Sequence, residues 1–137
     1  MVVLAIIGVL SAVVLGLLSK PRSSGADAAI KGDLRTIQTQ SQLFYGDNSD
    51  RYSTNGTGFP AASCPTSGVT MFAADTAIKN AIAHINSVSG TTATCYMNAT
   101  ASQYLVWIQL KTSGYWCVDH TGVSKSESVA YAAQTSC

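Results

Sequence analysis

Met1–Leu18 reads MVVLAIIGVLSAVVLGLL and contains no charged side chain. A helix rises about 1.5 Å per residue, so this stretch would span roughly 27 Å, close to the hydrocarbon core of a bilayer. Gly8 and Gly16 interrupt the apolar run, and Pro21 follows it. Because glycine and proline both weaken a helix interior, we expect the helix to bend or unwind between Gly8 and Pro21. Residues 1–21 therefore predict a helix that lies in a membrane, or in an apolar surround that replaces one.

The helical pattern continues beyond this segment, but from Arg22 to about Tyr45 it is apolar on one stripe only. The stripe contains Ile30, Leu34, Ile37 and Phe44, with Ser41 among them. The polar residues assigned to the opposite face are Asp27, Lys31, Asp33, Arg35 and Gln38. Asp27 and Lys31 are spaced and ordered for an i,i+4 ion pair. One long helix is therefore predicted, ending at the turn-rich residues 46–49, and its stripe requires a partner layer.

The remainder of residues 22–137 predicts a small α+β domain. A loop over residues 46–71 is rich in Gly, Ser, Thr and Pro, and a short helix is expected over residues 72–88. Strand-like runs follow over residues 92–98, 103–110 and 114–120, separated by short polar turns. We expect about three antiparallel strands to cover the long helix, with residues 105 and 107 on the opposite face from residues 106 and 108. The tail over residues 121–137 is weakly patterned.

Four cysteines lie beyond the apolar segment, at Cys64, Cys95, Cys117 and Cys137. An even number in a small exported domain predicts two disulfides, for which three connectivities are possible. We favour the sequential pairs Cys64–Cys95 and Cys117–Cys137, the second of which would close a C-terminal loop. The alternative is four free thiols in a cytosolic protein. Zinc is disfavoured because C-x-x-C and H-x-x-x-H spacings are missing.

Charge and composition favour an exported surface protein. Charged residues make up 11% of the 137-residue chain and its net charge is +1, which argues against nucleic acid as the main ligand. Lys20 and Arg22 follow the apolar segment, an order that would keep the domain in the cytoplasm and so conflicts with disulfides. A basic leader upstream of Met1 resolves this conflict, so we expect the precursor to begin earlier. A cleaved secretory signal peptide is the alternative.

Three segments resemble type IV pilins and the related pseudopilins. MVVLAIIGVLSAVV (Met1–Val14) resembles the hydrophobic N-terminus of that family. LRTIQTQSQLFYGDNSDRY (Leu34–Tyr52) resembles the end of its first helix, and GYWCVDHTG (Gly114–Gly122) resembles its terminal strand with a cysteine-closed loop. The leader, glycine, phenylalanine and glutamate that precede the apolar segment in the family are not part of this sequence. The prepilin peptidase site and the docking glutamate are therefore not seen, nor is the methylated N-terminus.

The resemblance implies a type IV pilin fold and a structural role. It implies the major subunit of an extracellular pilus that serves surface attachment, with twitching motility or DNA uptake as further roles. The subunit would wait in the inner membrane and then join a helical filament of identical subunits. The assembly machinery would include a platform protein, and the prepilin peptidase would act on the precursor. The implied filament-core residues are Met1, Val2, Val3, Leu4, Ile6, Ile7, Gly8, Leu10, Val13, Val14, Leu15, Gly16, Leu17 and Leu18.

Two other functions remain open: a pseudopilin of a type II secretion system, and a membrane-anchored extracellular binding or enzymatic domain. His120, with Cys117 and Asp119 nearby in sequence, is better explained by a strand end than by a catalytic or metal site. A calcium site at Asp47, Asp50 and Asp119 is disfavoured because no EF-hand pattern occurs. We therefore predict no enzyme, cofactor or specific nucleic-acid partner.

The sequence also carries two formal N-glycosylation sequons, Asn55-Gly56-Thr57 and Asn98-Ala99-Thr100. O-linked sugar on the Ser/Thr-rich loop is an equal alternative.

Overall fold

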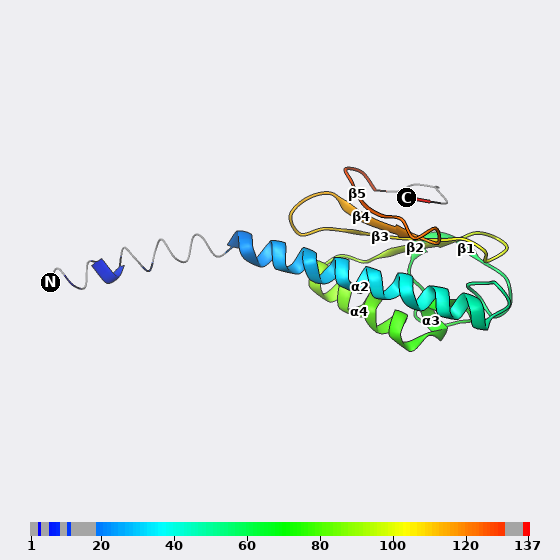
Figure 1. Cartoon of the computed structure of the whole chain (residues 1–137). Coiled ribbons are helices and arrows are strands. Elements are labelled where there is room, and N and C mark those ends of the chain that lie inside the picture. Colours follow the sequence, from blue (N-terminus) through cyan, green and yellow to red (C-terminus); the bar gives the residue numbers. More distant parts are fainter. Residues whose placement is uncertain (1–2, 4–5, 9–10, 12–18, 131–135) are drawn as a thin grey trace.

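The fold is α+β, as the sequence predicts. The computed structural model describes residues 3, 6–8, 11, 19–130 and 136–137. The long helix α2 (Ser19–Asp47) and the shorter α3 (Met71–Ala74) and α4 (Thr76–Ser89) pack together on one side of an antiparallel sheet. Figure 1 shows α2 running the length of this domain, with its N-terminal end projecting beyond the sheet.

Helix α2 buries the predicted stripe. Ile30, Leu34, Ile37 and Ser41 are fully buried, because residues at these spacings share one helix face. The helix ends at Asp47, inside the predicted stop, and the chain then reverses through left-handed residues at positions 49 and 50. No break occurs at Pro21, which is the third residue of α2. A bend nearer to Gly16 would lie outside the described residues.

Five strands form the sheet, two more than predicted. They are β1 (Phe59–Ser63), β2 (Thr94–Met97), β3 (Tyr104–Gln109), β4 (Tyr115–Asp119) and β5 (Ser124–Glu127). Each pairs antiparallel with the next, in the order β1-β2-β3-β4-β5. The central three strands are the predicted ones. The added strands are the two edges, whose sequences FPAAS and SKSE lack the apolar alternation of a half-buried strand.

The predicted short helix is divided into two. Asp75 has an extended backbone, and its side chain accepts a hydrogen bond from the Ile78 backbone N–H at 2.9 Å. This capping bond starts α4 and separates it from the single turn of α3. At the other end, Gly90 takes the left-handed conformation that commonly closes a helix. The prediction of one helix over residues 72–88 was therefore wrong at its first turn.

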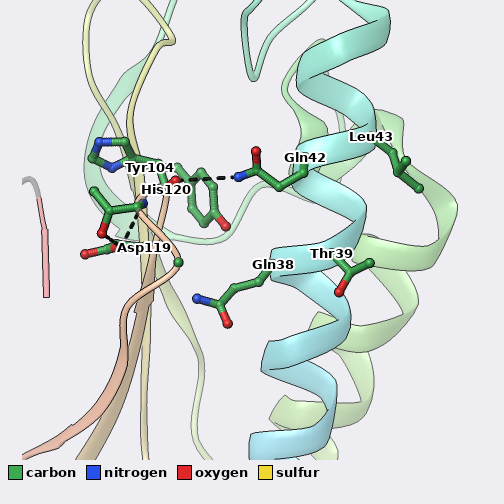
Figure 2. A pocket seen from close by; sticks show the side chains of 9 residues that line it. Gln38, Thr39, Gln42, Leu43, Tyr104, Asp119 and His120 are labelled. Carbon is green, nitrogen blue, oxygen red and sulfur yellow. Dashed lines mark hydrogen bonds between the residues drawn. The ribbon is translucent and has the colours of Figure 1, made fainter.

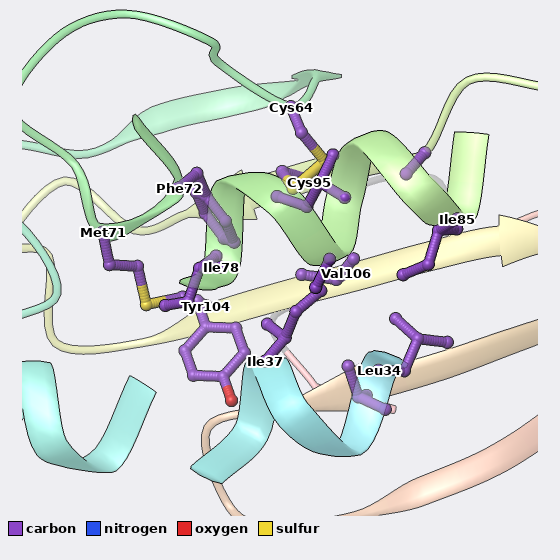
Figure 3. Packing of buried hydrophobic residues seen from close by; sticks show 14 of the residues in the cluster. Leu34, Ile37, Cys64, Met71, Phe72, Ile78, Ile85, Cys95, Tyr104 and Val106 are labelled. Atoms are coloured by element: carbon purple, nitrogen blue, oxygen red, sulfur yellow. A yellow bond between two sulfur atoms is a disulfide. The ribbon is translucent and has the colours of Figure 1, made fainter. Parts of the chain in front are cut away.

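The main core lies between the helices and the inner face of the sheet (Figure 3). The cluster joins α2, α4 and β3, and its members include Leu34, Ile37, Ile78, Ile85 and Val106. Alternation along β3 is confirmed, since residues 106 and 108 belong to this core whereas residues 105 and 107 form a second cluster with Cys117 on the outer face. The sheet therefore buries apolar side chains on both faces.

Both disulfides have the favoured connectivity. Cys64–Cys95 joins the end of β1 to β2 within the main core, and Cys117–Cys137 joins β4 to the C-terminal residue beside the outer cluster. All four cysteines are paired, which rules out the alternative of free thiols.

Most of the predicted filament-core segment lies outside the described residues. The described filament-core residues are helical; they are Val3, Ile6, Ile7 and Gly8. The other filament-core positions named above lie outside the described residues. Within the described part of the chain, we find no helix with the length and hydropathy of a membrane span.

Candidate functional site

The start of the predicted assembly helix is exposed in the isolated chain. Val3 is 68% exposed, and Ile6 and Ile7 are each 54% exposed. A methyl group added at Gly8 would meet open space. Large apolar side chains this exposed lose the favourable free energy of burial unless another apolar surface covers them. Val3, Ile6 and Ile7 are therefore accessible to an apolar surface from outside the chain.

Helix α2 is fastened to the β3–β4 hairpin by Asp27, a role that differs from the prediction. Asp27 is only 5% exposed, and its carboxylate accepts hydrogen bonds from the backbone N–H groups of Lys111 (2.7 Å) and Thr112 (3.3 Å) and from the Thr112 hydroxyl (2.5 Å). Lys31, its expected partner, places its ammonium 4.2 Å from the ring centroid of Trp116. The predicted ion pair was wrong because Asp27 precedes Ile30 by three residues and so faces the domain.

A groove of about 550 Å³ separates α2 from the turn between β4 and β5 (Figure 2). Two glutamines of α2 reach across it. The amide of Gln38 donates to the Val123 carbonyl at 2.9 Å, and that of Gln42 donates to the Tyr52 hydroxyl at 3.4 Å and the His120 carbonyl at 3.5 Å. The groove is lined by Gln38, Thr39, Gln42, Leu43, Tyr104, Asp119, His120, Thr121 and Gly122. These bonds attach the C-terminal half of α2 to the sheet, as Asp27 attaches its N-terminal half.

On the sheet side of the groove, Asp119 connects the β4–β5 turn to the C-terminal residue. One oxygen of its buried carboxylate accepts from the Thr121 backbone N–H (2.9 Å) and hydroxyl (2.6 Å) and from the Val123 backbone N–H (3.2 Å). The other oxygen accepts from the Cys137 backbone N–H at 2.8 Å. Because Cys137 is also bonded to Cys117, the C-terminal end is held to β4 by a covalent bond and a hydrogen bond.

Tyr104 forms the floor of the groove and belongs to an aromatic group. Its hydroxyl shares a 2.7 Å hydrogen bond with Ser41 of α2, and its ring meets that of Tyr52 edge-on at 4.8 Å between centroids. Burial raises the pKa of the Tyr104 phenol well above its usual value, and the Ser41 hydrogen bond only partly opposes this. Burial raises the pKa of Tyr52 as well. The folded chain therefore holds both phenols in the neutral form.

These tyrosines should make the domain sensitive to alkali. The unfolded chain ionises its tyrosines near pH 10, whereas folded Tyr104 keeps its proton, so stability present below about pH 10 is lost as pH rises. Replacing Tyr104 with Phe should flatten this decline while costing about 1 kcal/mol at neutral pH for the lost Ser41 hydrogen bond. Urea titrations from pH 8 to pH 11 would measure both effects. An unchanged alkaline slope in Y104F would contradict the assignment.

The two histidines lie apart. His84 on α4 contacts Asp33 of α2 at 2.6 Å on the surface, and His120 lies at the groove with its Nδ1 buried and unpartnered. Nowhere in the described part of the chain do three His, Cys, Asp or Glu side chains gather as a metal site would require. Gln38, Gln42 and Asp119 in the groove are hydrogen-bonded to other parts of the chain, so the arrangement fastens the helix to the sheet.

Sequence reasoning located the disulfides but missed the two buried carboxylates. Asp27 had a detectable signal, because it shares the periodicity of the buried stripe. For Asp119, the sequence carried no signal of burial beyond its place at the end of an apolar strand. Comparisons of the chain with protein-family models, with curated proteins and with solved structures give no match.

Proposed function

We propose that this chain is the major subunit of an extracellular type IV pilus. One observation carries the proposal: the apolar segment Met1–Val14, which resembles the pilin N-terminus, precedes helix α2 in the chain, and α2 is attached to the sheet through both its N-terminal and its C-terminal half. Asp27 attaches the helix to the β3–β4 hairpin, and Gln38 and Gln42 attach it to the β4–β5 turn. A helix held in this way can carry a domain along a filament.

Assembly would follow from the apolar surface of the helix. Before assembly, the inner membrane covers residues 1–18. During assembly, with the platform protein, the same residues pack against their counterparts in neighbouring subunits, so that one apolar surround replaces another. The exposure of Val3, Ile6 and Ile7 supports a segment whose cover comes from outside the chain. Repetition of one heterologous contact that does not close into a ring gives a helical filament.

The attachments of α2 also suit a fibre under tension. Force applied to the N-terminal segment passes along α2 to the hairpin at Asp27 and to the sheet at the groove. From there, Cys64–Cys95 joins β1 to β2 and Cys117–Cys137 joins the C-terminal end to β4. Under load, these covalent cross-links limit how far the joined segments can separate. Surface attachment would then use the end of the domain that is remote from the N-terminal segment (Figure 1).

Electron microscopy of appendages sheared from the native cells tests this proposal, with mass spectrometry of the fibre protein. Thin fibres built from this chain are the expected result, and the mass of its N-terminal peptide would give the first residue of the mature subunit. Retention of the chain in the membrane fraction, with fibres made of another protein, would contradict the proposal. A pseudopilin or an anchored extracellular domain would then be favoured.

Deleting residues 1–18 should convert the chain into a monomer. The buried core begins at Ile30, so residues 19–137 keep the packing that stabilises the domain, while the exposed apolar start is removed. Light scattering coupled to size exclusion, followed by microscopy, would measure the change. Ile7→Asp should abolish fibres in the full chain, whereas Leu43→Ser, at an exposed apolar residue on the distal half of α2, serves as the matched control. Fibres formed by the truncated chain would contradict the helix-core arrangement.

A further inference from the structure

The two sequons lie close together in the fold although 43 positions separate Asn55 from Asn98 in sequence. Phe59, at the start of β1, pairs with Met97, at the end of β2. Between them and the first sequon, Gly58 packs so tightly that a Cβ there would lie 1.9 Å from the Asn98 carbonyl oxygen. The two asparagines therefore share one end of the domain, and the state of each side-chain amide distinguishes them.

The amide of Asn98 is fully engaged. Its Oδ1 accepts hydrogen bonds from the backbone N–H groups of Ser102 (2.8 Å) and Gln103 (3.0 Å). Its Nδ2 donates to the hydroxyls of Thr100 (3.1 Å) and Ser102 (3.0 Å). Because backbone N–H groups can only donate, the oxygen and nitrogen positions are fixed by the network. Asn98 thus shapes the turn between β2 and β3, and its nitrogen is not free to react.

The amide of Asn55 is engaged only through its oxygen. Oδ1 accepts from the Thr57 backbone N–H (3.1 Å), the Thr57 hydroxyl (2.8 Å) and the Ser53 hydroxyl (2.6 Å). The Thr57 N–H again fixes which atom is the oxygen, so Nδ2 faces away from these donors. Asn55 is exposed, and its Nδ2 has no hydrogen-bond partner among the described residues. The sequon threonine is already bonded to the side chain that would be modified.

We propose that Asn55 is an N-glycosylation site and that Asn98, in the folded chain, is not. In the reaction, Asn55 Nδ2 attacks the anomeric carbon of a sugar activated on phosphate, as a nucleotide diphosphate or a lipid pyrophosphate. A nitrogen–carbon bond forms while the bond from the anomeric carbon to the phosphate oxygen breaks. The nitrogen gives up one proton to a base, and the phosphate departs with the bonding electrons. A sequon-reading glycosyltransferase supplies the base and the donor site.

The position of Asn55 allows a glycan without disturbing the rest of the fold. It lies in the loop that follows α2, at the end of the domain remote from the N-terminal segment (Figure 1). Its side chain contributes to none of the buried contacts of the core. A sugar there would cover part of the end of the domain that is remote from the N-terminal segment. This inference requires export of the chain and does not depend on filament assembly.

Peptide mass spectrometry of the chain purified from its native cells is the decisive experiment. The expected result is a glycopeptide containing Asn55 and an unmodified peptide containing Asn98. The mass of the sugar identifies its source, since a single hexose indicates a nucleotide-activated donor and a preformed oligosaccharide indicates a lipid-linked one. An Asn55 peptide without sugar, or a sugar on Asn98, would overturn the proposal.

A second experiment tests why one sequon is chosen. The folded full chain in detergent is incubated with a soluble sequon-specific N-glycosyltransferase and a nucleotide-activated hexose. We expect Asn55 to be modified at least ~10-fold faster than Asn98, because modification of Asn98 must first break its hydrogen bonds. Reduction and unfolding should bring the two rates together. Thr57→Ser should retain modification and Thr57→Ala should lose it, while equal rates at both sequons in the folded chain would refute the structural selection.

Discussion

Reduction of the two disulfides should lower the free energy of unfolding by about 3–4 kcal/mol for each bond. Cys64–Cys95 closes a separation of 31 residues and Cys117–Cys137 one of 20, so each limits the conformational entropy of the unfolded chain to a similar degree. Denaturant titrations with and without dithiothreitol would measure the change. Since a small domain has a total stability of about 5–15 kcal/mol, loss of both bonds should leave it largely unfolded at moderate temperature.

Paired variants separate the two contributions. Cys64→Ala with Cys95→Ala removes buried sulfur from the main core as well as the cross-link, so this variant should lose the most stability. Cys117→Ala with Cys137→Ala removes the covalent attachment of the C-terminal residue and leaves its hydrogen bond to Asp119. Because one hydrogen bond holds this end more weakly, the end should detach more readily and expose Trp107, which is 6% exposed in the intact chain. Protease cleavage near residue 130 and a red shift of tryptophan fluorescence would report this local opening. A melting profile that dithiothreitol does not change would contradict both predictions.

The central architecture could be predicted because its signals are periodic. Ile30, Leu34 and Ile37 repeat at the helical period, and residues 105–108 alternate at the strand period, so each pattern gives both an element and the face that it buries. Four cysteines similarly limit two disulfides to three possible connectivities, of which the sequential one is found. A local sequence pattern is enough to predict an element when burial of one face is the main constraint on its residues.

The edges of the fold could not be predicted because tertiary contacts determine them. Strand β5 has the sequence SKSE, and its pairing with β4 depends on backbone hydrogen bonds that carry no side-chain pattern. Asp75 divided the second helix because its side chain caps α4, although the apolar spacing continues across it. The groove has the same origin. Gln38 was assigned to the polar face and Gln42 carried no signal, yet each bonds a carbonyl about 80 positions away in sequence.

Replacement of Asp27 by Ala should destabilise the domain by about 2–3 kcal/mol, far more than is usual for an acidic residue on a helix surface. The carboxylate accepts three hydrogen bonds from the β3–β4 hairpin, and two of its donors are backbone N–H groups that would lose their partner. Water can reach Lys111 and Thr112, which are exposed, so the cost stays below that of a fully buried unsatisfied pair. Urea titration at neutral pH would measure the loss, and hydrogen exchange at the Lys111 and Thr112 amides should accelerate.

Asp33 provides the matched control, because it lies on the same helix and its side chain pairs with His84 at the surface. Its 2.6 Å contact with His84 is at the surface, where the His84 side chain is 57% exposed, so Asp33→Ala should cost less than about 1 kcal/mol. Asp27→Asn should be intermediate, since the amide keeps one acceptor but turns a donor toward a backbone N–H. Equal losses in D27A and D33A would show that the hairpin does not depend on Asp27. The expected order, with D27A the most destabilised, would make the Asp27 carboxylate the main attachment of the N-terminal half of α2 to the β3–β4 hairpin, beside the attachment of its C-terminal half by Gln38 and Gln42.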